Sequence, residues 1–150
     1  MKKKIAGISA ALLLMGSLVC SATVAPYNVD VDMQLGDIRL NSISVVDDGY
    51  CTVIQLSHMI YVRKPSNSNK ILQVDFKGFG STVNGISVGS DFDPAKVTEG
   101  KLAAKWRHGA MVYYTYVLPD GSIVRYNTIA KIGTVESITR ISKTLNDINE

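Results

Sequence analysis

The chain has few of the residues from which disulfide frameworks and metal sites are built. It contains two cysteines, Cys20 and Cys51, and two histidines, His58 and His108, all far apart in the sequence. A structural zinc site needs four nitrogen or sulfur ligands, usually in close pairs, so these residues predict no zinc site.

Carboxylates are also not arranged as an ion site. Asp30 and Asp32 share one face of an expected strand, and Asp91 and Asp93 flank Phe92. Neither pair lies in the Asp-rich loop that is typical of calcium sites. We interpret the first pair as solvent-facing carboxylates and Asp93 as a helix cap, and we expect neither metal nor cofactor.

Motifs of catalysis are absent as well. The chain has no G-x-S-x-G nucleophile elbow, and the glycines of KGFGSTVNG lack the spacing of a phosphate-binding loop. His58 and His108 both lie at expected strand boundaries. We therefore predict that the protein is not an enzyme and name no catalytic residue, although a site assembled from distant residues stays open.

The N-terminus has the layout of a secretory signal peptide. Lys2, Lys3 and Lys4 precede an apolar run over residues 5–19 that is shorter than the about 20 residues of a spanning helix. Cleavage near Ala22 satisfies the need for small residues at the cut, and it predicts a periplasmic or secreted protein. A lipoprotein anchored at Cys20 is the alternative, which the β-branched Val19 before the cysteine disfavours.

Basic charge is concentrated in this leader. Its three lysines account for the formal net charge of +3, so residues 23–150 are neutral overall. A neutral chain lacks the basic surface of a nucleic-acid-binding protein. We therefore expect one domain over residues 23–150 that binds no nucleic acid and contains no transmembrane span.

Short β-like runs alternate with turn signals through residues 28–127, which predicts a β-sandwich or small β-barrel of antiparallel hairpins. The clearest single strand is YNVDVDMQL. HMIYVR and KILQVDF predict two further strands, and TVNGISV predicts a weaker hairpin that turns at Asn84-Gly85.

Two hairpins share a turn with a left-handed glycine, at Gly49 and Gly121. In the first, the turn predicts that Val46 pairs with Tyr50 and Val45 with Cys51, which makes Cys51 a core thiol. The second predicts three pairs: Leu118 with Ser122, Tyr116 with Val124, and Tyr114 with Tyr126. The opposite, wetter face then carries Met111, Tyr113, Thr115, Arg125 and Asn127.

Two segments have helical spacing. Pro94 after Asp93 predicts the start of a short internal helix, with Ala95, Leu102, Ala103 and Trp106 on its buried side. A C-terminal amphipathic helix is predicted over about residues 134–149. Its apolar stripe would comprise Val135, Ile138, Ile141, Leu145 and Ile148.

Binding residues are concentrated around KLAAKWRHGAMVYYTY. Tryptophan, tyrosine and arginine anchor many binding surfaces, so we select Trp106, Arg107, Tyr113 and Arg125 as candidates. The competing interpretation places Trp106 in the core and the nearby lysines on a solvated face.

These observations together predict an exported, non-catalytic binding or accessory protein. It would act on a protein partner at the bacterial envelope, as an inhibitor, an immunity factor, or a secretion or adhesion accessory. The alternative is a small periplasmic ligand- or glycan-binding domain or hydrolase. A third possibility is a structural protein that oligomerises through its sheet edges. The sequence leaves the oligomeric state open.

Overall fold

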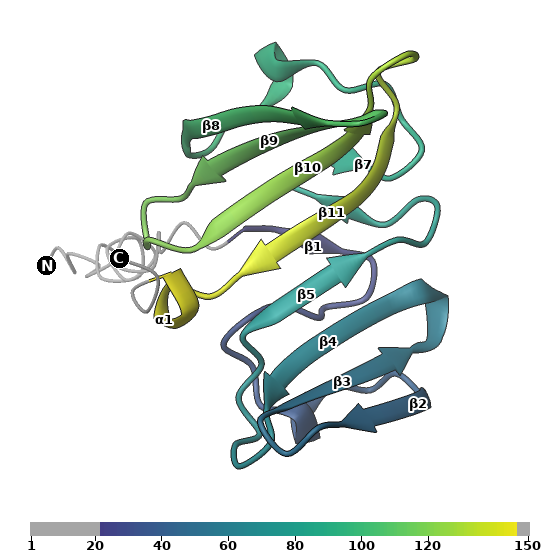
Figure 1. The fold of residues 1–150 in the computed structure, drawn as a ribbon, viewed down its shortest axis with the longest axis vertical. Helices are drawn as coiled ribbons and strands as arrows, with labels where there is room; N and C mark the ends of the chain where they lie inside the picture. Colours follow the sequence, from purple (N-terminus) through teal and green to yellow (C-terminus); the bar gives the residue numbers. More distant parts are fainter. Residues whose placement is uncertain (1–21, 147–150) are drawn as a thin grey trace, which may run out of the picture.

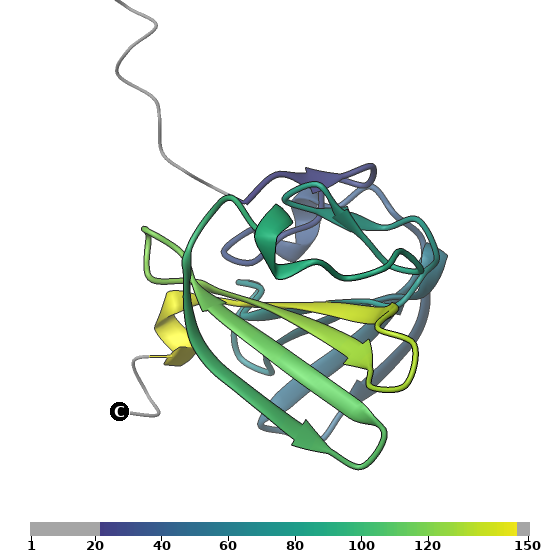
Figure 2. The same ribbon diagram turned by 90° about the horizontal axis from the view of Figure 1, so that it is seen from above.

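A computed structural model describes residues 22–146, which form a sandwich-like arrangement of two antiparallel sheets (Figures 1 and 2). The prediction of a mainly β fold is confirmed. In chain order the elements are β1 (Val24–Ala25), η1 (Leu35–Asp37), β2 (Ser42–Asp47), β3 (Cys51–Leu56), η2 (Ser57–Met59), β4 (Ile60–Pro65), β5 (Gln73–Phe76), β6 (Thr82–Val83), β7 (Ile86–Ser87), η3 (Pro94–Lys96), β8 (Lys101–His108), β9 (Met111–Val117), β10 (Ile123–Ile129), β11 (Val135–Ile141) and α1 (Lys143–Asn146).

The large sheet has the order β2-β3-β4-β5-β11-β10-β9-β8, and in Figure 1 it runs from β8 at the top to β2 at the bottom. It consists of two meanders, β2 to β5 and β8 to β11, which are joined where β5 pairs with β11. β2 and β8 are therefore its two edges. The small sheet has the order β1-β6-β7.

The small sheet and the N-terminal segment cover one face of the large sheet (Figure 2). Fully buried side chains from both layers form the core between them, including Val29 and Val83 from the covering layer and Val74, Phe76 and Tyr126 from the large sheet. Burial of such apolar side chains is the main favourable contribution to folding.

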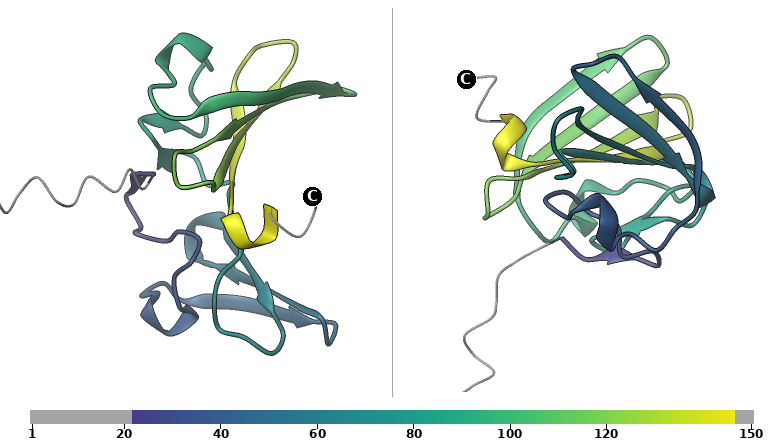
Figure 3. Two further views of the ribbon diagram at one scale, coloured as in Figure 1. Left: turned by 90° about the vertical axis from the view of Figure 1, so that its left-hand side faces the viewer. Right: turned by 90° about the horizontal axis from the view of Figure 1, so that it is seen from below.

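The other face of the large sheet is mostly open. Both ends of the sheet, β8–β9 and β2–β3, bend away from the covering layer, which makes the open face concave (Figure 3). Among the described residues, α1 lies on this side, at the end of β11, and Leu145 and Cys51 line the same small cavity.

The β9–β10 hairpin has the predicted register. Val124 pairs with Tyr116 and Tyr126 with Tyr114, and the Leu118 N–H donates to the Ser122 carbonyl at 2.8 Å. Alternation of side chains along the two strands then places the tyrosines and valines of one face in the core, as predicted.

The predicted register of the β2–β3 hairpin is wrong. Val46 pairs with Val53 instead of Tyr50. The Asp48 carboxylate accepts the N–H groups of Tyr50 and Cys51 at 2.9 and 2.8 Å, and these bonds hold both residues in a wider turn. The odd shift moves Cys51 and Val53 to the open face, so Cys51 is half-buried and not a core thiol.

Both helix predictions need correction. Asp93 caps the turn that begins at Pro94, with the Ala95 N–H donating to its carboxylate at 3.0 Å, but η3 ends at Lys96. Leu102, Ala103 and Trp106 lie on β8. Pairing with β9 outweighs the helix propensity of the lysines, leucine and alanines in KLAAKWRH, because local propensity is a weak term.

The C-terminal helix is four residues long, over Lys143–Asn146. Val135, Ile138 and Ile141 from its predicted apolar stripe belong to β11, which is paired on both sides at the centre of the large sheet. β-branched residues favour such a strand. Ile148 lies outside the described residues.

The strand predicted for YNVDVDMQL is also absent. Val29 and Val31 are buried as the alternation requires, but Asn28 and Asp32 have φ values of +50° and +68°, which interrupt an extended chain. Asp30 and Asp32 are bonded to other segments and do not form a solvent-facing row.

Candidate functional site

Three of the four candidate binding residues come together on the open face. Trp106 of β8 pairs with Tyr113 of β9, and their rings stack with centroids 4.0 Å apart and planes 15° from parallel. The guanidinium carbon of Arg125 on β10 lies 5.6 Å from the centroid of the Tyr113 ring. We call Trp106, Tyr113 and Arg125 the aromatic platform.

Strand geometry explains this cluster. Successive side chains of a strand point to opposite faces, and the antiparallel register of β8, β9 and β10 brings same-face residues of the three strands into contact. The Arg125–Tyr113 contact has the geometry of a cation–π interaction, which favours one position of the guanidinium.

Arg107 does not belong to the platform. It follows Trp106 on β8 and therefore points to the other side of the strand, where its Nε donates to the Gly109 carbonyl at 3.0 Å. Lys105 is on the same side, with its Nζ 5.1 Å from the centroid of the Tyr114 ring. Lys101 pairs with Val117, on the same face of the sheet as Tyr113, so both sides of β8 present positive charge.

A row of hydrogen-bonded polar side chains supports the platform from the centre of the sheet. It runs from Arg125 Nε to Asn127 Oδ1 at 3.1 Å, and from Asn127 Nδ2 to Thr139 Oγ1 at 3.2 Å. Thr139 Oγ1 in turn donates to Asp75 Oδ1 at 2.7 Å, and Gln73 Nε2 donates to the other Asp75 oxygen at 2.9 Å. We call these residues the polar row.

The aromatic platform and the polar row differ in the exposure of their side chains. Trp106 is 45% exposed, whereas Asn127 and Thr139 are 6% and 1% exposed. Buried polar groups of this kind are satisfied by one another and hold their neighbours in place. The platform is therefore the part that a ligand can touch, and the polar row positions Arg125.

Sequence reasoning missed the polar row because its members come from three strands, of which β5 lies far from β10 and β11 in the chain. Asn127 was expected on the same face as Arg125, but Thr139 was assigned to a helix. The helical interpretation of residues 134–149 removed the one strand that connects Asn127 to Asp75.

The β8 edge borders the platform. All eight of its residues are exposed, and among residues 22–146 the strand pairs only with β9. Its outer N–H and C=O groups are thus free to pair with another chain. A hollow of about 450 Å³ opens at the start of this edge, lined by Gly100, Lys101, Val117, Leu118 and Pro119.

Both histidines are exposed. His58 is exposed with a φ of +63°, and its ring stacks on Tyr27 with centroids 4.4 Å apart. His108 is exposed at the end of β8. Within the described part of the chain, no carboxylate bonds to either imidazole, and no group of His, Cys, Asp and Glu residues is arranged to hold a metal ion.

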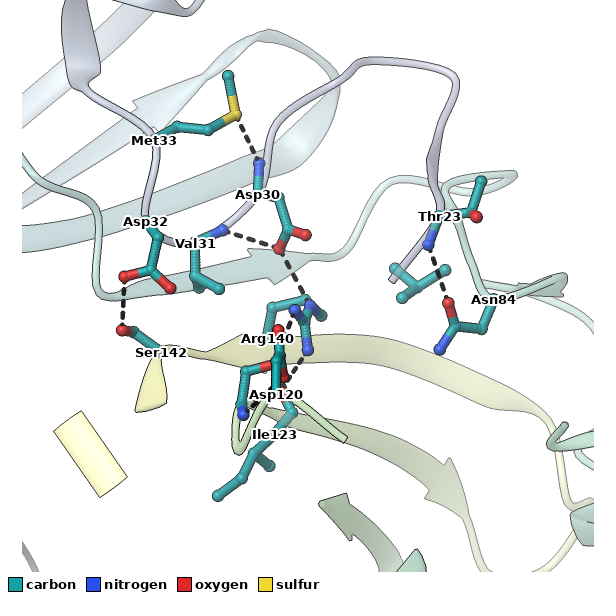
Figure 4. Close-up of polar contacts among 12 residues, drawn as sticks. Thr23, Asp30, Val31, Asp32, Met33, Asn84, Asp120, Ile123, Arg140 and Ser142 are labelled. Carbon is teal, nitrogen blue, oxygen red and sulfur yellow. Dashed lines mark hydrogen bonds and ion pairs between the residues drawn. The ribbon is translucent and has the colours of Figure 1, made fainter. Parts of the chain in front are cut away.

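Arg140 is at the centre of a buried polar cluster that joins two segments of the fold. Arg140 is 2% exposed, and its three nitrogens donate to Asp30 Oδ1 at 3.0 Å, the Ile123 carbonyl at 2.9 Å and Ser122 Oγ at 3.1 Å (Figure 4). Burial raises the pKa of the Asp30 carboxyl, although Arg140 beside it acts in the opposite direction. This cluster ties the N-terminal segment to the large sheet.

Comparisons with known proteins identify no relative of this chain. Among residues 22–146, no helix has the length and apolar character needed to cross a membrane. No family model matches the chain, and neither a curated protein nor a solved structure is significantly similar to it.

Proposed function

We propose that this chain is an exported, non-catalytic binding module that takes up an extended segment of a protein partner along β8. One observation carries the proposal: an unpaired, fully exposed edge strand lies directly beside the aromatic platform. In strand addition, main-chain hydrogen bonds supply affinity and the alternating side chains supply specificity. A segment paired with β8 would contact Trp106 on one side and Arg107 on the other.

The chemistry of β8 defines the segment that fits. Lys101, Lys105 and Arg107 are exposed along the edge, so acidic side chains in the partner are favoured and basic ones are repelled. Trp106 provides an apolar surface, and the hollow beside Lys101 is lined by apolar residues that suit one apolar side chain. The preferred segment therefore combines acidic and apolar residues.

Saccharide binding on the open face is the second candidate. An exposed tryptophan on the same sheet face as the amide and carboxylate side chains of the polar row is the observation in its favour. However, Asn127 and Thr139 are almost fully buried and bonded to one another, which leaves few polar groups for sugar hydroxyls. Strand addition uses groups that are exposed, so we favour it.

Export rests on the predicted signal peptide, most of which lies outside the described residues. A cut after Ala22 would leave Thr23 as the first residue, whose backbone nitrogen bonds to Asn84 Oδ1 at 3.0 Å. A cut after Ala25 would instead remove β1. The proposed site is compatible with the first cut, and intact-mass measurement of the exported protein distinguishes the two.

The test uses selection from a random displayed peptide library on the immobilised full chain, with Trp106→Ala protein for counter-selection. Trp106 is the only tryptophan, so its fluorescence reports directly on binding of a selected synthetic peptide. We expect enriched peptides to be rich in acidic and apolar residues. Enrichment of basic peptides, or of none, would contradict the proposal.

Two N-methylated versions of the selected peptide distinguish strand addition from other binding modes. Only alternate residues of an added strand donate to the edge that it joins. Methylation of one alternate set should abolish the fluorescence change, and methylation of the other set should leave it. Equal binding of both versions would show that β8 is not extended by the peptide, and saturation by oligosaccharides alone would favour the second candidate.

A further inference from the structure

The opposite edge of the large sheet, β2, is exposed in a different way. Ile43, Val45 and Val46 are 63%, 59% and 66% exposed, and Tyr50 in the adjoining turn is 89% exposed. Within the described residues β2 pairs only with β3. Edge strands of soluble proteins are usually protected by lysines or other charges within the strand, and β2 has none before Asp47.

An apolar groove extends this surface beneath the strand. Its volume is about 320 Å³, and it is lined by Leu35, Ile38, Leu40, Ser42, Val45, Ile54 and Leu56. The groove lies between the segment around η1 and the strands β2 and β3. An unpaired edge and a continuous apolar patch together mark a protein interface.

Charge along the edge is self-complementary. Arg39 precedes β2, Asp47 is its last residue, and Asp48 follows it. Asp47 accepts hydrogen bonds from the Gly49 N–H and the Thr52 hydroxyl, which lower its pKa to about 2, so it is charged at neutral pH. Two antiparallel copies of this segment would place unlike charges opposite each other at both ends.

We propose that two copies of this chain associate through β2, as a symmetric antiparallel pair centred on Ser44. This register places Ile43 of each copy opposite Val45 of the other, and Arg39 opposite the turn next to Asp48. A pair centred on Val45 would instead oppose Ile43 and Asp47. Ile43 lies at the irregularity in the pairing of β2 with β3, between Ser42 and Ser44.

A symmetric pair of β2 strands is more favourable than pairing of β8 with β8 or of β2 with β8. Two β8 strands would oppose Lys101, Lys105 and Arg107 with the same residues and repel each other. Contact between β2 and β8 is not symmetric, so it would generate open chains of copies and occupy the edge proposed for the partner. This inference goes beyond the proposed function, because it concerns the other edge.

Cross-linking tests the register. Ser44→Cys in a Cys51→Ser background should give a covalent dimer on mild oxidation or with a short bis-maleimide, because paired residues lie about 4.5–5.5 Å apart between Cβ atoms. Ile132→Cys is the matched control, since Ile132 is 65% exposed but lies in the β10–β11 loop, and it should give none. Cross-linking of Ser44→Cys to Ala104→Cys in a mixture would overturn the proposal in favour of open chains.

Sedimentation equilibrium tests the association without cross-links. The unmodified chain should show a concentration-dependent dimer. Val46→Lys should raise the dissociation constant of this dimer about tenfold or more. Ile132→Lys should leave the constant unchanged. A monomer at submillimolar concentration, or a dimer equally stable with Val46→Lys, would overturn the proposal. Peptide binding at β8 is measured separately, so failure of one proposal leaves the other distinguishable.

Discussion

β2 and β8 are both fully exposed edges of one sheet, but they differ in the charge that they carry and in what lies beside them. β8 has basic side chains on both of its faces and borders the aromatic platform. β2 has apolar side chains, lacks basic residues and borders an apolar groove. The two proposals follow this difference: β8 would select an acidic partner, and β2 would pair with a second copy of itself. Four predictions test whether the two edges act independently.

Loss of the Arg140 cluster should disable both edges at once and has the largest expected effect. Arg140→Ala leaves the Asp30 carboxylate without its buried partner, and breaking a buried pair in this way costs about 3–5 kcal/mol of unfolding free energy. Urea unfolding measures the change. Asp30→Asn, which keeps an oxygen acceptor, should cost less, and a loss below about 1 kcal/mol with Arg140→Ala would contradict the structural role.

Loss of the platform should affect β8 alone. Trp106→Ala should weaken binding of a selected peptide about 30-fold or more, as for a central aromatic anchor, and stability should fall by about 1 kcal/mol because the ring is only half-buried. Fluorescence anisotropy of a labelled peptide measures the affinity. The dimer constant should not change; a parallel loss of dimer would show that the edges are coupled.

Salt should weaken peptide binding at β8 more than it weakens the β2 dimer. The expected change is smaller than that caused by Trp106→Ala. The proposed binding at β8 would use Lys101, Lys105 and Arg107, and exposed charges are screened beyond a distance of about 10 Å at 0.1 M salt. Raising the salt concentration should therefore weaken peptide binding several-fold and change the β2 dimer less, because most of its contact is apolar. Equal sensitivity of both constants, measured by titration and sedimentation, would contradict this assignment.

The pH dependence of the β2–β3 turn is the smallest expected effect. Asp47 has a pKa of about 2, against 3.8 for the free carboxyl, because Thr52, Gly49 and Ser66 donate hydrogen bonds to it. Its stabilising effect is complete above the unfolded value and is lost as pH falls through about 2. Carbon NMR of the carboxyl should show this low midpoint, and Thr52→Ala should raise it; a midpoint near 3.8 in the unsubstituted protein would exclude these bonds.

The sequence was sufficient where one face of a hairpin is apolar and the other polar. In MVYYTYVLPDGSIVRY, the alternation and the glycine turn together determined the register, and with it the contact of Tyr113 and Arg125. The same reasoning failed at Asp47-Asp48-Gly49, because hydrogen bonds from the Tyr50 and Cys51 N–H groups to the Asp48 carboxylate widened the turn. Carboxylates in a turn can thus reset the pairing of both strands.

Strands without a two-residue period could not be recognised from their own sequence. β11 is buried on both faces at the sheet centre, and β8 is exposed on both faces at the edge, so neither alternates clearly. Both were assigned to helices, which concealed the polar row and the free edge. Trp106 was nevertheless selected for its residue type, and the fold places it on the platform.

Hydrogen exchange at single-residue resolution tests the central claim that β8 is extended by a partner strand. With a selected peptide bound, amide protons of alternate residues between Lys101 and His108 should become protected, because only those N–H groups face the added strand. The amides of β2 should be unchanged by the peptide. Binding without protection at β8, or protection confined to β2, would contradict the account.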